Sequence, residues 1–373
     1  MALTLQTAIK GAGSSTAIII PSKPNPLTVT YNDLIKETAS FQQKLAAIGI
    51  TKGAPVSIAT VNSYEFIISF LAASWQRGIA APLNPAYKQD EFEFYIEDVK
   101  SAIVLVPRGA YQSNAPAVKA AKKFNAAIAE TYWDASKKEV ALDVKELGQL
   151  QGKPKEQILK PEPSDVALVL HTSGTTSRPK VVPLTHANLT RTMSNIQKTY
   201  ELTDKDRTML VMPLFHVHGL LCGLLAPFLS GGSMIVPTKF SAGEFWQDFA
   251  AHKANWYTAV PTIHQILLKN PTPNPLPAIR FIRSCSSPLS PTVFHNLEKT
   301  YKAPDIGVAV VLKSGEKLEQ DELRKWIADK LAKFKVPKKV YFTETMPKTA
   351  TGKIQRRIVA EIMQKQDVPK AKL

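Results

Sequence analysis

Short apolar runs alternate with amphipathic segments along most of this 373-residue chain. Residues 56–60, 80–83 and 102–106 have the composition of buried strands, and apolar residues recur at helical spacing in the intervening segments 64–76 and 89–99. A repeated order of strand, helix and strand is typical of a largely parallel sheet covered by helices. The pattern therefore predicts an α/β fold.

The alternation weakens between residues 112 and 160, where lysines are frequent and strong apolar runs are few. This part is expected to be a looser, partly helical connection. Further along, a helix is expected to begin at Ser290, because Ser is a good N-cap and Pro291 fits the first helical position. Core strands are expected before it, at 209–212, 234–236, 256–260 and 280–284.

The C-terminal part is expected to contain a helix, a strand and a second helix. Apolar residues line one helical face over 319–334, a strand is expected at 340–342, and isoleucines recur every four residues from Ile354 to Ile362. These elements would hold the loop that precedes Ile354 from both sides.

Positive charge dominates the ionisable residues, with 47 Lys and Arg against 31 Asp and Glu and a formal net charge of +16. Such an excess suits nucleic acid, an anionic membrane surface or a polyanionic small molecule. The cations are scattered, however, and no ribonucleoprotein, zinc-finger or basic-helix motif accompanies them. Nucleic acid is therefore disfavoured as a partner, although charge alone does not exclude it.

The cysteines and the longest apolar stretch argue against other classes. Cys222 and Cys285 are the only cysteines, which favours a reducing compartment over a disulfide framework and gives no basis for a metal cluster. Residues 217–237 are the longest apolar stretch, but His218, Pro227 and two glycines interrupt it. We therefore expect a buried helix followed by a strand rather than a transmembrane segment. The N-terminus lacks the apolar core of a signal peptide.

A loop rich in hydroxyl groups follows the apolar run 166–170 and precedes a helix that is expected to begin near Thr185. Backbone N–H groups, hydroxyls and cations in such a loop can surround a polyphosphate, and Gly174 has no side chain where the backbone must come closest. The loop is not the P-loop of NTPases, because Pro179 stands where that motif needs a glycine. Without further evidence, an ordinary surface loop is an equally good interpretation. The residues expected to hold phosphate are Thr172, Ser173, Gly174, Thr175, Thr176 and Lys180.

A second loop near the C-terminus favours the phosphate interpretation. Residues 347–354 read Pro-Lys-Thr-Ala-Thr-Gly-Lys-Ile and are followed by Gln355, Arg356 and Arg357. In this order the two loops resemble those of the adenylate-forming enzymes, which include acyl-CoA synthetases, luciferases and the adenylation domains of peptide synthetases. The resemblance covers nearly all residues from Leu27 onward, and the sequence is most similar to fungal peroxisomal coenzyme A synthetases and plant oxalate–CoA ligases.

The resemblance implies a fold and a division into domains. An incomplete adenylation domain with parallel sheets covered by helices is expected over residues 1–304, and part of a small α+β C-terminal domain over 305–373. The first loop would bind the phosphates of ATP. Lys353, on the second loop, would act as a catalytic residue that contacts the reacting carboxylate and the α-phosphate. ATP, Mg²⁺ and coenzyme A are the implied co-substrates.

The resemblance also implies roles for two further segments. Residues 212–219 match a segment that lines the acyl pocket, so His216 and His218 are candidates for substrate contact and His216 for catalysis. Without the resemblance, packing in an apolar turn would be the better interpretation of both. Residues 283–290 match a strand end that cradles adenine and borders the acyl group. The expected contacts there are Ser284, Ser286, Ser287 and Pro288.

One departure from the family pattern is large. Between the counterparts of Pro304 and Ile306, family members carry a Glu that helps to hold Mg²⁺, a Thr-Gly-Asp motif that grips the ribose, the interdomain hinge and a loop used in thioester formation. Here Pro304 runs directly into Asp305, so this sequence has no matching metal ligand. The chain is expected to turn over weakly or not at all, and to expose a strand edge near 279–284.

The sequence thus predicts an AMP-forming acid–CoA ligase of a small dicarboxylate such as oxalate, with a medium-chain fatty or aromatic acid as the alternative substrate. A non-catalytic nucleotide- or RNA-binding protein is the alternative class. The last residues, Ala371, Lys372 and Leu373, are similar to the Ser-Lys-Leu signal that the peroxisomal import receptor reads. The peroxisome is therefore the expected location, with the cytoplasm as the alternative.

Overall fold

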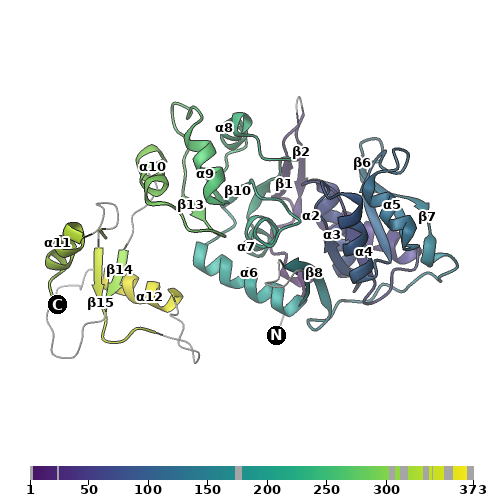
Figure 1. Ribbon diagram of the computed structural model, residues 1–373, viewed down its shortest axis with the longest axis horizontal. Helices are drawn as coiled ribbons and strands as arrows, with labels where there is room; N and C mark the ends of the chain where they lie inside the picture. Colours follow the sequence, from purple (N-terminus) through teal and green to yellow (C-terminus); the bar gives the residue numbers. More distant parts are fainter. Residues whose placement is uncertain are drawn as a thin grey trace. The chain divides into compact units, whose positions relative to one another are not determined.

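The chain forms two compact units, whose helices and strands are labelled in Figure 1. The first unit spans residues 1–259 and 272–286, and the second spans 260–271 and 287–373. The domain boundary predicted at residue 304 lies outside the described residues. The computed structural model describes residues 3–22, 25–172, 179–301, 307–310, 318–330, 336–337, 339–347 and 356–367.

A seven-stranded sheet lies in the first unit, in the order β7-β6-β5-β3-β4-β8-β9. The inner strands pair in parallel, and β7 and β9 are added antiparallel at the two edges. The predicted β-α-β winding and the α/β fold class are confirmed. The strands are β3 (Pro55–Ile58), β4 (Ile79–Pro82), β5 (Ile103–Pro107), β6 (Ala127–Asp134), β7 (Glu139–Glu146), β8 (Val166–Thr172) and β9 (Lys180–Thr185).

The interpretation of residues 112–160 as a looser connection is wrong. α5 (Pro116–Lys123) leads into β6, which pairs with β7 in a long antiparallel hairpin. The apolar signal is weak for two reasons. The buried half of β6 is rich in small alanines, and β7 is an edge strand in which Val140 alone is fully buried. A strand with one solvated face needs few strongly apolar residues.

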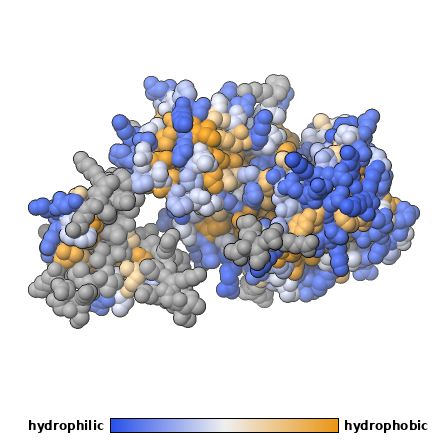
Figure 2. Space-filling view, viewed as in Figure 1, coloured by the Kyte–Doolittle hydropathy of each residue, from blue (hydrophilic) through white to orange (hydrophobic). Residues whose placement is uncertain are grey.

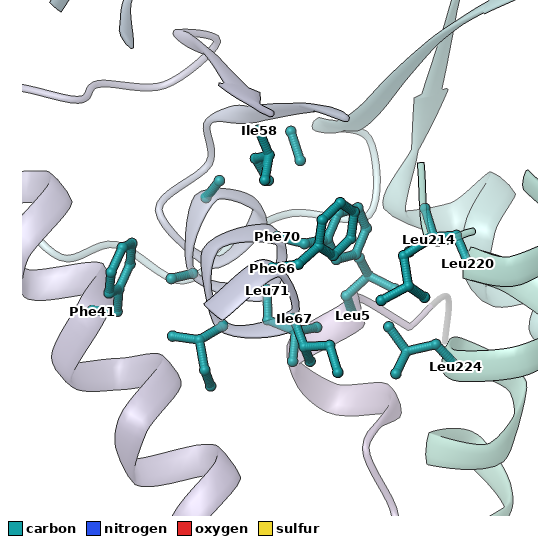
Figure 3. Packing of buried hydrophobic residues seen from close by; sticks show 14 of the residues in the cluster. Leu5, Phe41, Ile58, Phe66, Ile67, Phe70, Leu71, Leu214, Leu220 and Leu224 are labelled. Carbon is teal, nitrogen blue, oxygen red and sulfur yellow. The ribbon is translucent and has the colours of Figure 1, made fainter. Parts of the chain in front are cut away.

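α3 (Tyr64–Trp75) lies at the centre of the largest hydrophobic core. All of its residues except one are buried, and the Ser63 side chain caps it by accepting a hydrogen bond from the Phe66 N–H at 3.1 Å. Figure 3 shows its side chains packed around Leu5 and leucines of the segment 214–224. Burial of each large apolar side chain stabilises the fold by about 2 kcal/mol. α1 (Leu5–Ala8), α2 (Tyr31–Ala47) and η1 (Gly148–Leu150) contribute to the same core. α4 (Gln89–Val99) packs with α5 in a separate hydrophobic cluster that includes Phe92 and Ile96.

A six-stranded sheet also belongs to the first unit, in the order β13-β12-β10-β11-β1-β2. All neighbours are parallel except β1 and β2. The four core strands predicted before Ser290 are confirmed. The strands are β1 (Thr16–Ile20), β2 (Leu27–Thr30), β10 (Arg207–Leu210), β11 (Ser233–Ile235), β12 (Trp256–Ala259) and β13 (Phe281–Ser284), and the helices are α6 (His186–Tyr200), η2 (His218–Leu225), α7 (Ala226–Ser230) and α8 (Ala242–Ala251).

The apolar stretch 217–237 forms helices and then a strand, as predicted. The π-helix η2 continues directly into α7, Gly231 ends α7 in a left-handed conformation, and β11 follows. Within the described part of the chain, no helix combines the length and the apolar character that a membrane crossing requires.

β13 lies at the edge of the six-stranded sheet, as the sequence predicts. Its apolar side chains, Phe281 and Ile282, are partly buried. The Phe281 ring stacks on Trp256 with 5.0 Å between centroids and meets Tyr200 edge-on at 5.8 Å. The expected apolar surface near this edge is thus partly covered by neighbouring rings.

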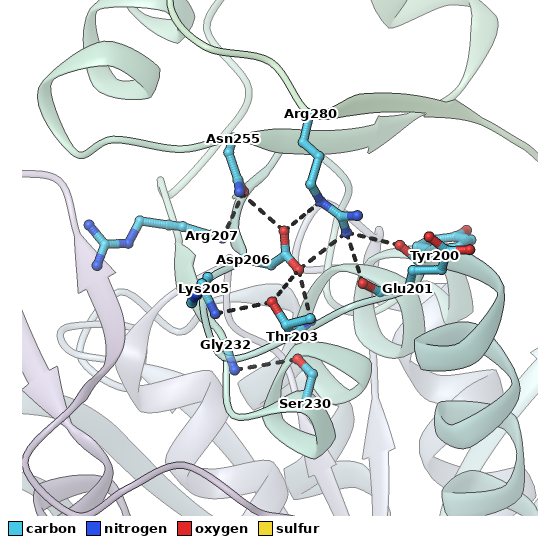
Figure 4. Close-up of polar contacts among 10 residues, drawn as sticks. All are labelled: Tyr200, Glu201, Thr203, Lys205, Asp206, Arg207, Ser230, Gly232, Asn255 and Arg280. Atoms are coloured by element: carbon cyan, nitrogen blue, oxygen red, sulfur yellow. Dashed lines mark hydrogen bonds and ion pairs between the residues drawn. The ribbon is translucent and has the colours of Figure 1, made fainter. Parts of the chain in front are cut away.

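Residues that precede three strands of this sheet are tied together by one carboxylate (Figure 4). Asp206 precedes β10, Asn255 precedes β12 and Arg280 precedes β13. The Asp206 carboxylate accepts hydrogen bonds from Arg280 Nε at 2.7 Å, from the Thr203 N–H at 2.7 Å and from Asn255 Nδ2 at 3.1 Å. Its side chain is 4% exposed, so these donors replace water.

A second buried carboxylate fixes the start of β8. Asp165 accepts two hydrogen bonds from the Arg77 guanidinium, at 2.7 and 3.0 Å, and one from the Glu162 N–H at 2.8 Å. Lys52 Nζ lies 3.1 Å from the same carboxylate, and the Asp165 side chain is 3% exposed. Because Arg77 precedes β4, this cluster joins two neighbouring strands.

Acid is expected to weaken the Asp165 contacts. Burial alone would raise the pKa of this carboxyl, but hydrogen bonds from Arg77, the Glu162 N–H and Lys52 outweigh it and hold the pKa at about 2. The unfolded chain has an Asp pKa of roughly 3.9, so the contribution of about 2 kcal/mol is present above that value and is lost as the pH falls towards 2.

Urea unfolding at a series of pH values tests this expectation. The difference in unfolding free energy between the natural protein and Asp165→Asn should narrow by about 1.5 kcal/mol between roughly pH 6 and pH 2.5. Ile67→Val, a buried change without a titratable group, provides the control and should give a difference independent of pH. A difference for Asp165→Asn that stays constant would contradict the argument.

The second unit contains short elements. The helix predicted from Ser290 is confirmed as α10, and the predicted helix over 319–334 and strand at 340–342 are confirmed as α11 and β15. β14 and β15 pair in parallel, and α12 begins after Ile354, which lies outside the described residues. The elements are α9 (Pro261–Leu268), α10 (Pro291–Tyr301), β14 (Gly307–Val310), α11 (Gln320–Lys330), β15 (Lys339–Phe342) and α12 (Arg356–Asp367).

Candidate functional site

The hairpin of β8 and β9 carries both ends of the predicted phosphate loop. Thr172 ends β8 and Lys180 begins β9, and the two residues are paired in the antiparallel register. Both are exposed, so the sheet fixes the ends of the loop and leaves a hydroxyl and an ammonium group open to solvent. The predicted loop residues that lie outside the described part are Ser173, Gly174, Thr175 and Thr176.

β9 separates this loop from the next helix. The strand is missed by the sequence reasoning because it is a half-exposed edge strand that contains Pro183. The helix predicted near Thr185 is confirmed: α6 begins at His186, and the Thr185 hydroxyl accepts a hydrogen bond from the Asn188 N–H at 3.2 Å. Lys180 is therefore placed by a strand rather than by a free loop.

His171, beside the phosphate loop, is held by α4. Its Nε2 lies 2.9 Å from the Asp98 carboxylate, and its ring meets Tyr95 edge-on with 4.6 Å between centroids. These contacts orient the end of β8 from which the loop departs. Sequence reasoning missed this pair, because Asp98 and His171 are far apart in the chain and neither belongs to a motif.

The two candidate histidines have different surroundings. His216 is exposed and lies against the Phe215 ring, 4.6 Å between centroids, whereas His218 is buried. Desolvation lowers the pKa of both imidazoles from the ordinary value, so both are neutral at neutral pH. His216 can therefore meet a ligand from solvent, while His218 acts through the side chains packed around it.

His218 joins three side chains near the carboxyl ends of β12 and β13. Its Nε2 lies 2.8 Å from Thr258 Oγ1 and 3.2 Å from Cys285 Sγ, and its Nδ1 lies 3.3 Å from Ser286 Oγ. The carboxyl edge of a parallel sheet is where α/β proteins bind ligands. Sequence reasoning selected neither Thr258 nor Cys285 as a site residue.

Asn62 positions the segment that carries both histidines. Its side-chain amide donates to the Met212 carbonyl at 3.1 Å and accepts from the Leu214 N–H at 2.8 Å. Gly219 allows the backbone of this segment to pack closely on itself, because a Cβ at this position would lie 2.2 Å from the Pro213 carbonyl oxygen. Sequence reasoning did not select Asn62, since it lies far from this segment in the chain.

The other predicted contacts of the 283–290 segment are divided between the two units. Ser284 ends β13, and its hydroxyl is buried without a hydrogen-bond partner among the described residues. Ser286 has a φ of 71°, in the left-handed region that residues other than glycine rarely adopt. Ser287 and Pro288 are exposed residues of the second unit.

The remaining predicted site residue, Lys353, lies outside the described residues, as do Pro304 and the C-terminal Ala371, Lys372 and Leu373. Across the ranges that the structure does describe, no three His, Cys, Asp or Glu side chains are grouped so that they could hold a metal ion. The described residues therefore do not form a resident Mg²⁺ site.

Two family models match this chain. Residues 5–309 match the family described as AMP-binding enzyme, and residues 300–353 match the AMP-binding enzyme C-terminal domain. The oxalate–CoA ligase of Saccharomyces cerevisiae is 32% identical over 524 residues, which cover 96% of this chain and 96% of that protein. The oxalate–CoA ligase of Arabidopsis thaliana is 42% identical over 306 residues, 80% of this chain and 58% of that protein.

Solved structures share the fold at lower identity. The crystal structure of ATP-bound MatB from Rhodopseudomonas palustris is similar with a TM-score of 0.67 and 18% identity, over 97% of this chain and 99% of that chain.

The alignment with the yeast relative runs over 524 positions, more than the 373 residues of this chain, so this chain has a long gap in that alignment. The chain spans little more than half of the plant relative. The match over residues 5–309 is sufficient to assign the family: the chain belongs to the AMP-binding enzymes.

Proposed function

We propose that this chain is an acid–CoA ligase of the AMP-forming type that retains ATP binding and has lost most of its turnover. The observation that carries the proposal is the junction: the two family matches meet at residues 300–309, although the yeast relative aligns only across a long gap. A chain shortened at this point keeps both binding loops. It lacks the segment whose carboxylates are predicted to contact Mg²⁺ and the ribose.

The proposed reaction joins a carboxylic acid to coenzyme A at the expense of ATP. Thr172 and Lys180, with Ser173, Gly174, Thr175 and Thr176, would hold the phosphates, because hydroxyls and an ammonium group complement their charge. His216 would meet the acyl group, because its neutral imidazole is exposed. Lys353 would stabilise the charge that develops on the reacting carboxylate and α-phosphate.

Ser284, Ser286, Ser287 and Pro288 are proposed to border the adenine and the acyl group. The buried His218 would not contact the substrate directly but would orient the side chains of Thr258, Cys285 and Ser286. Oxalate is the proposed acid, because two relatives are named oxalate–CoA ligases. The peroxisome is the proposed location, with Ala371, Lys372 and Leu373 as the signal for the import receptor.

ATP binding tests this proposal directly. Lys180→Ala is expected to raise the Kd for ATP by roughly ten-fold, because it removes a cation from the phosphate site. Lys198→Ala removes an exposed lysine from the last turn of α6 and should leave the Kd unchanged. Isothermal titration of ATP into each variant gives the two values. An unchanged Kd for Lys180→Ala would refute the assignment of the loop.

A non-catalytic RNA-binding protein is the second candidate, supported by the net charge of +16. Figure 2 shows hydrophilic residues over α4 and α5, but lysines on this face are paired: Lys122 Nζ lies 3.0 Å from Glu146, and Lys123 contacts Glu93. RNA affinity that falls steeply with salt and does not respond to Lys180→Ala would favour this alternative.

A further inference from the structure

A nucleophile and a base lie side by side at the carboxyl edge of the six-stranded sheet. Cys285 Sγ is 3.2 Å from Nε2 of His218, and both residues belong to the first unit. At this distance an imidazole can take the proton of a thiol directly. The thiolate, rather than the thiol, is the nucleophilic form of cysteine.

The second ring nitrogen of His218 is also held in place. Ser286 Oγ lies 3.3 Å from Nδ1, and the left-handed backbone of Ser286, with a φ of 71°, brings its side chain to this position. When Nδ1 carries the proton, its N–H donates a hydrogen bond to Ser286 Oγ. Nε2 is then unprotonated and can accept a hydrogen bond from the thiol. A base that is oriented by a third group is the arrangement that activates catalytic nucleophiles.

Thr258 contacts both partners of the pair. Its Oγ1 lies 2.8 Å from His218 Nε2 and 3.6 Å from Cys285 Sγ. With Nε2 accepting from the thiol, the Thr258 hydroxyl can donate to the sulfur, and this hydrogen bond strengthens once the thiolate has formed. A hydrogen bond to the charged form favours that form, so this donor adds to the effect of the base.

The other cysteine of the chain provides an internal comparison. Burial raises the pKa of the Cys222 thiol to about 11, which keeps it protonated at neutral pH. Both thiols are partly exposed, but the residues that follow Cys285 in the chain are exposed and only Cys285 has a histidine within hydrogen-bond distance among the described contacts. A reagent from solvent can therefore reach Cys285 at a position where a base is already in contact.

We propose that Cys285 accepts an acyl group from an activated carboxyl compound, with His218 as the general base. The Sγ proton moves to Nε2, sulfur forms a bond to the carbonyl carbon, and the bond from that carbon to the leaving group breaks. The leaving group, a thiolate or a phosphate oxygen, departs with the electron pair, and Nε2 then releases the proton. The product is a thioester on Cys285, and no atom changes oxidation state.

The choice of an acyl donor rests on the proposed function, whereas the reactivity of the thiol rests on the geometry alone. Two preformed donors distinguish the possible sources of the acyl group. Acetyl-CoA is a thioester, and acetyl-AMP is an acyl phosphate. After incubation with the full-length chain, intact mass and peptide mapping are expected to show one acetyl group on Cys285 that hydroxylamine removes. Acetylation by either donor supports the proposal and identifies the source.

Three variants define the roles. Cys285→Ser is expected to lose the acetyl group, and Cys222→Ser to keep it. His218→Asn retains hydrogen-bonding capacity but cannot take the proton, so acetylation should be at least about 100-fold slower. An unchanged rate in this variant would overturn the assignment of His218 as the base.

Alkylation by iodoacetamide in the natural chain provides a measurement that does not depend on the folding of any variant. Cys285 is expected to react at least about ten-fold faster than Cys222. Equal rates, or the lack of acetyl transfer from both donors, would overturn the proposal. Because the donors are supplied preformed, a failure to bind ATP would count against the proposed function and would not affect this test.

Discussion

Asp206→Ala is expected to lower the free energy of unfolding of the first unit by about 3 kcal/mol. The carboxylate is 4% exposed and accepts hydrogen bonds from groups that precede three strands of the six-stranded sheet. Its removal leaves the Thr203 N–H without its acceptor and takes the carboxylate partner from Arg280, whose guanidinium keeps only the carbonyls of Tyr200 and Glu201 among these contacts. The lost charge pairing and the unsatisfied donors both favour the unfolded chain.

Urea unfolding followed by tryptophan fluorescence measures this loss, because Trp256 lies in β12 beside the affected strands. Asp204→Ala is the matched control, since it removes an exposed carboxylate two residues earlier in the same turn and should change stability by less than about 0.5 kcal/mol. Equal effects of the two substitutions would show that the contacts of Asp206 do not hold the strands together.

The alternation of apolar and amphipathic segments was sufficient to predict the central strands and helices. α3 illustrates why: its 12 residues are mostly apolar, and a run of this length is too long for a typical strand, so length favours a helix. β6, β7 and β9 could not be predicted in the same way. Each pairs at an edge of the sheet or uses small residues, and the partner strand rather than the local pattern defines it.

The candidate site was only partly accessible to sequence reasoning. Motif order predicted the phosphate loop, and resemblance predicted a substrate role for the segment that contains His216 and His218; both stay predictions. Neither could reveal that His218 contacts Thr258 and Cys285, because these contacts depend on β12 and β13 lying side by side. Residues brought together by strand order, without a shared motif, become visible only in three dimensions.

The junction after Pro304 could be recognised from the sequence only through the family resemblance. α10 and β14, on either side of it, continue the alternation of helix and strand as an uninterrupted chain would. The physical reason is that short helices and strands are local elements, and joining two of them leaves no mark in the hydrophobic pattern. The proposed loss of turnover depends instead on carboxylates that the family pattern places in this segment.

Restoring that segment, taken from the yeast oxalate–CoA ligase, between Pro304 and Asp305 is expected to raise oxalate-dependent AMP release by at least about 100-fold. One preorganised electrostatic contact contributes roughly 3 kcal/mol to transition-state stabilisation, and the segment is predicted to supply more than one. A glycine-serine insert of equal length is the matched control and should give no gain, and Lys353→Ala should abolish the gain. AMP release by the natural chain at the rate of the yeast enzyme would contradict this argument, because the chain would then have no need of the segment.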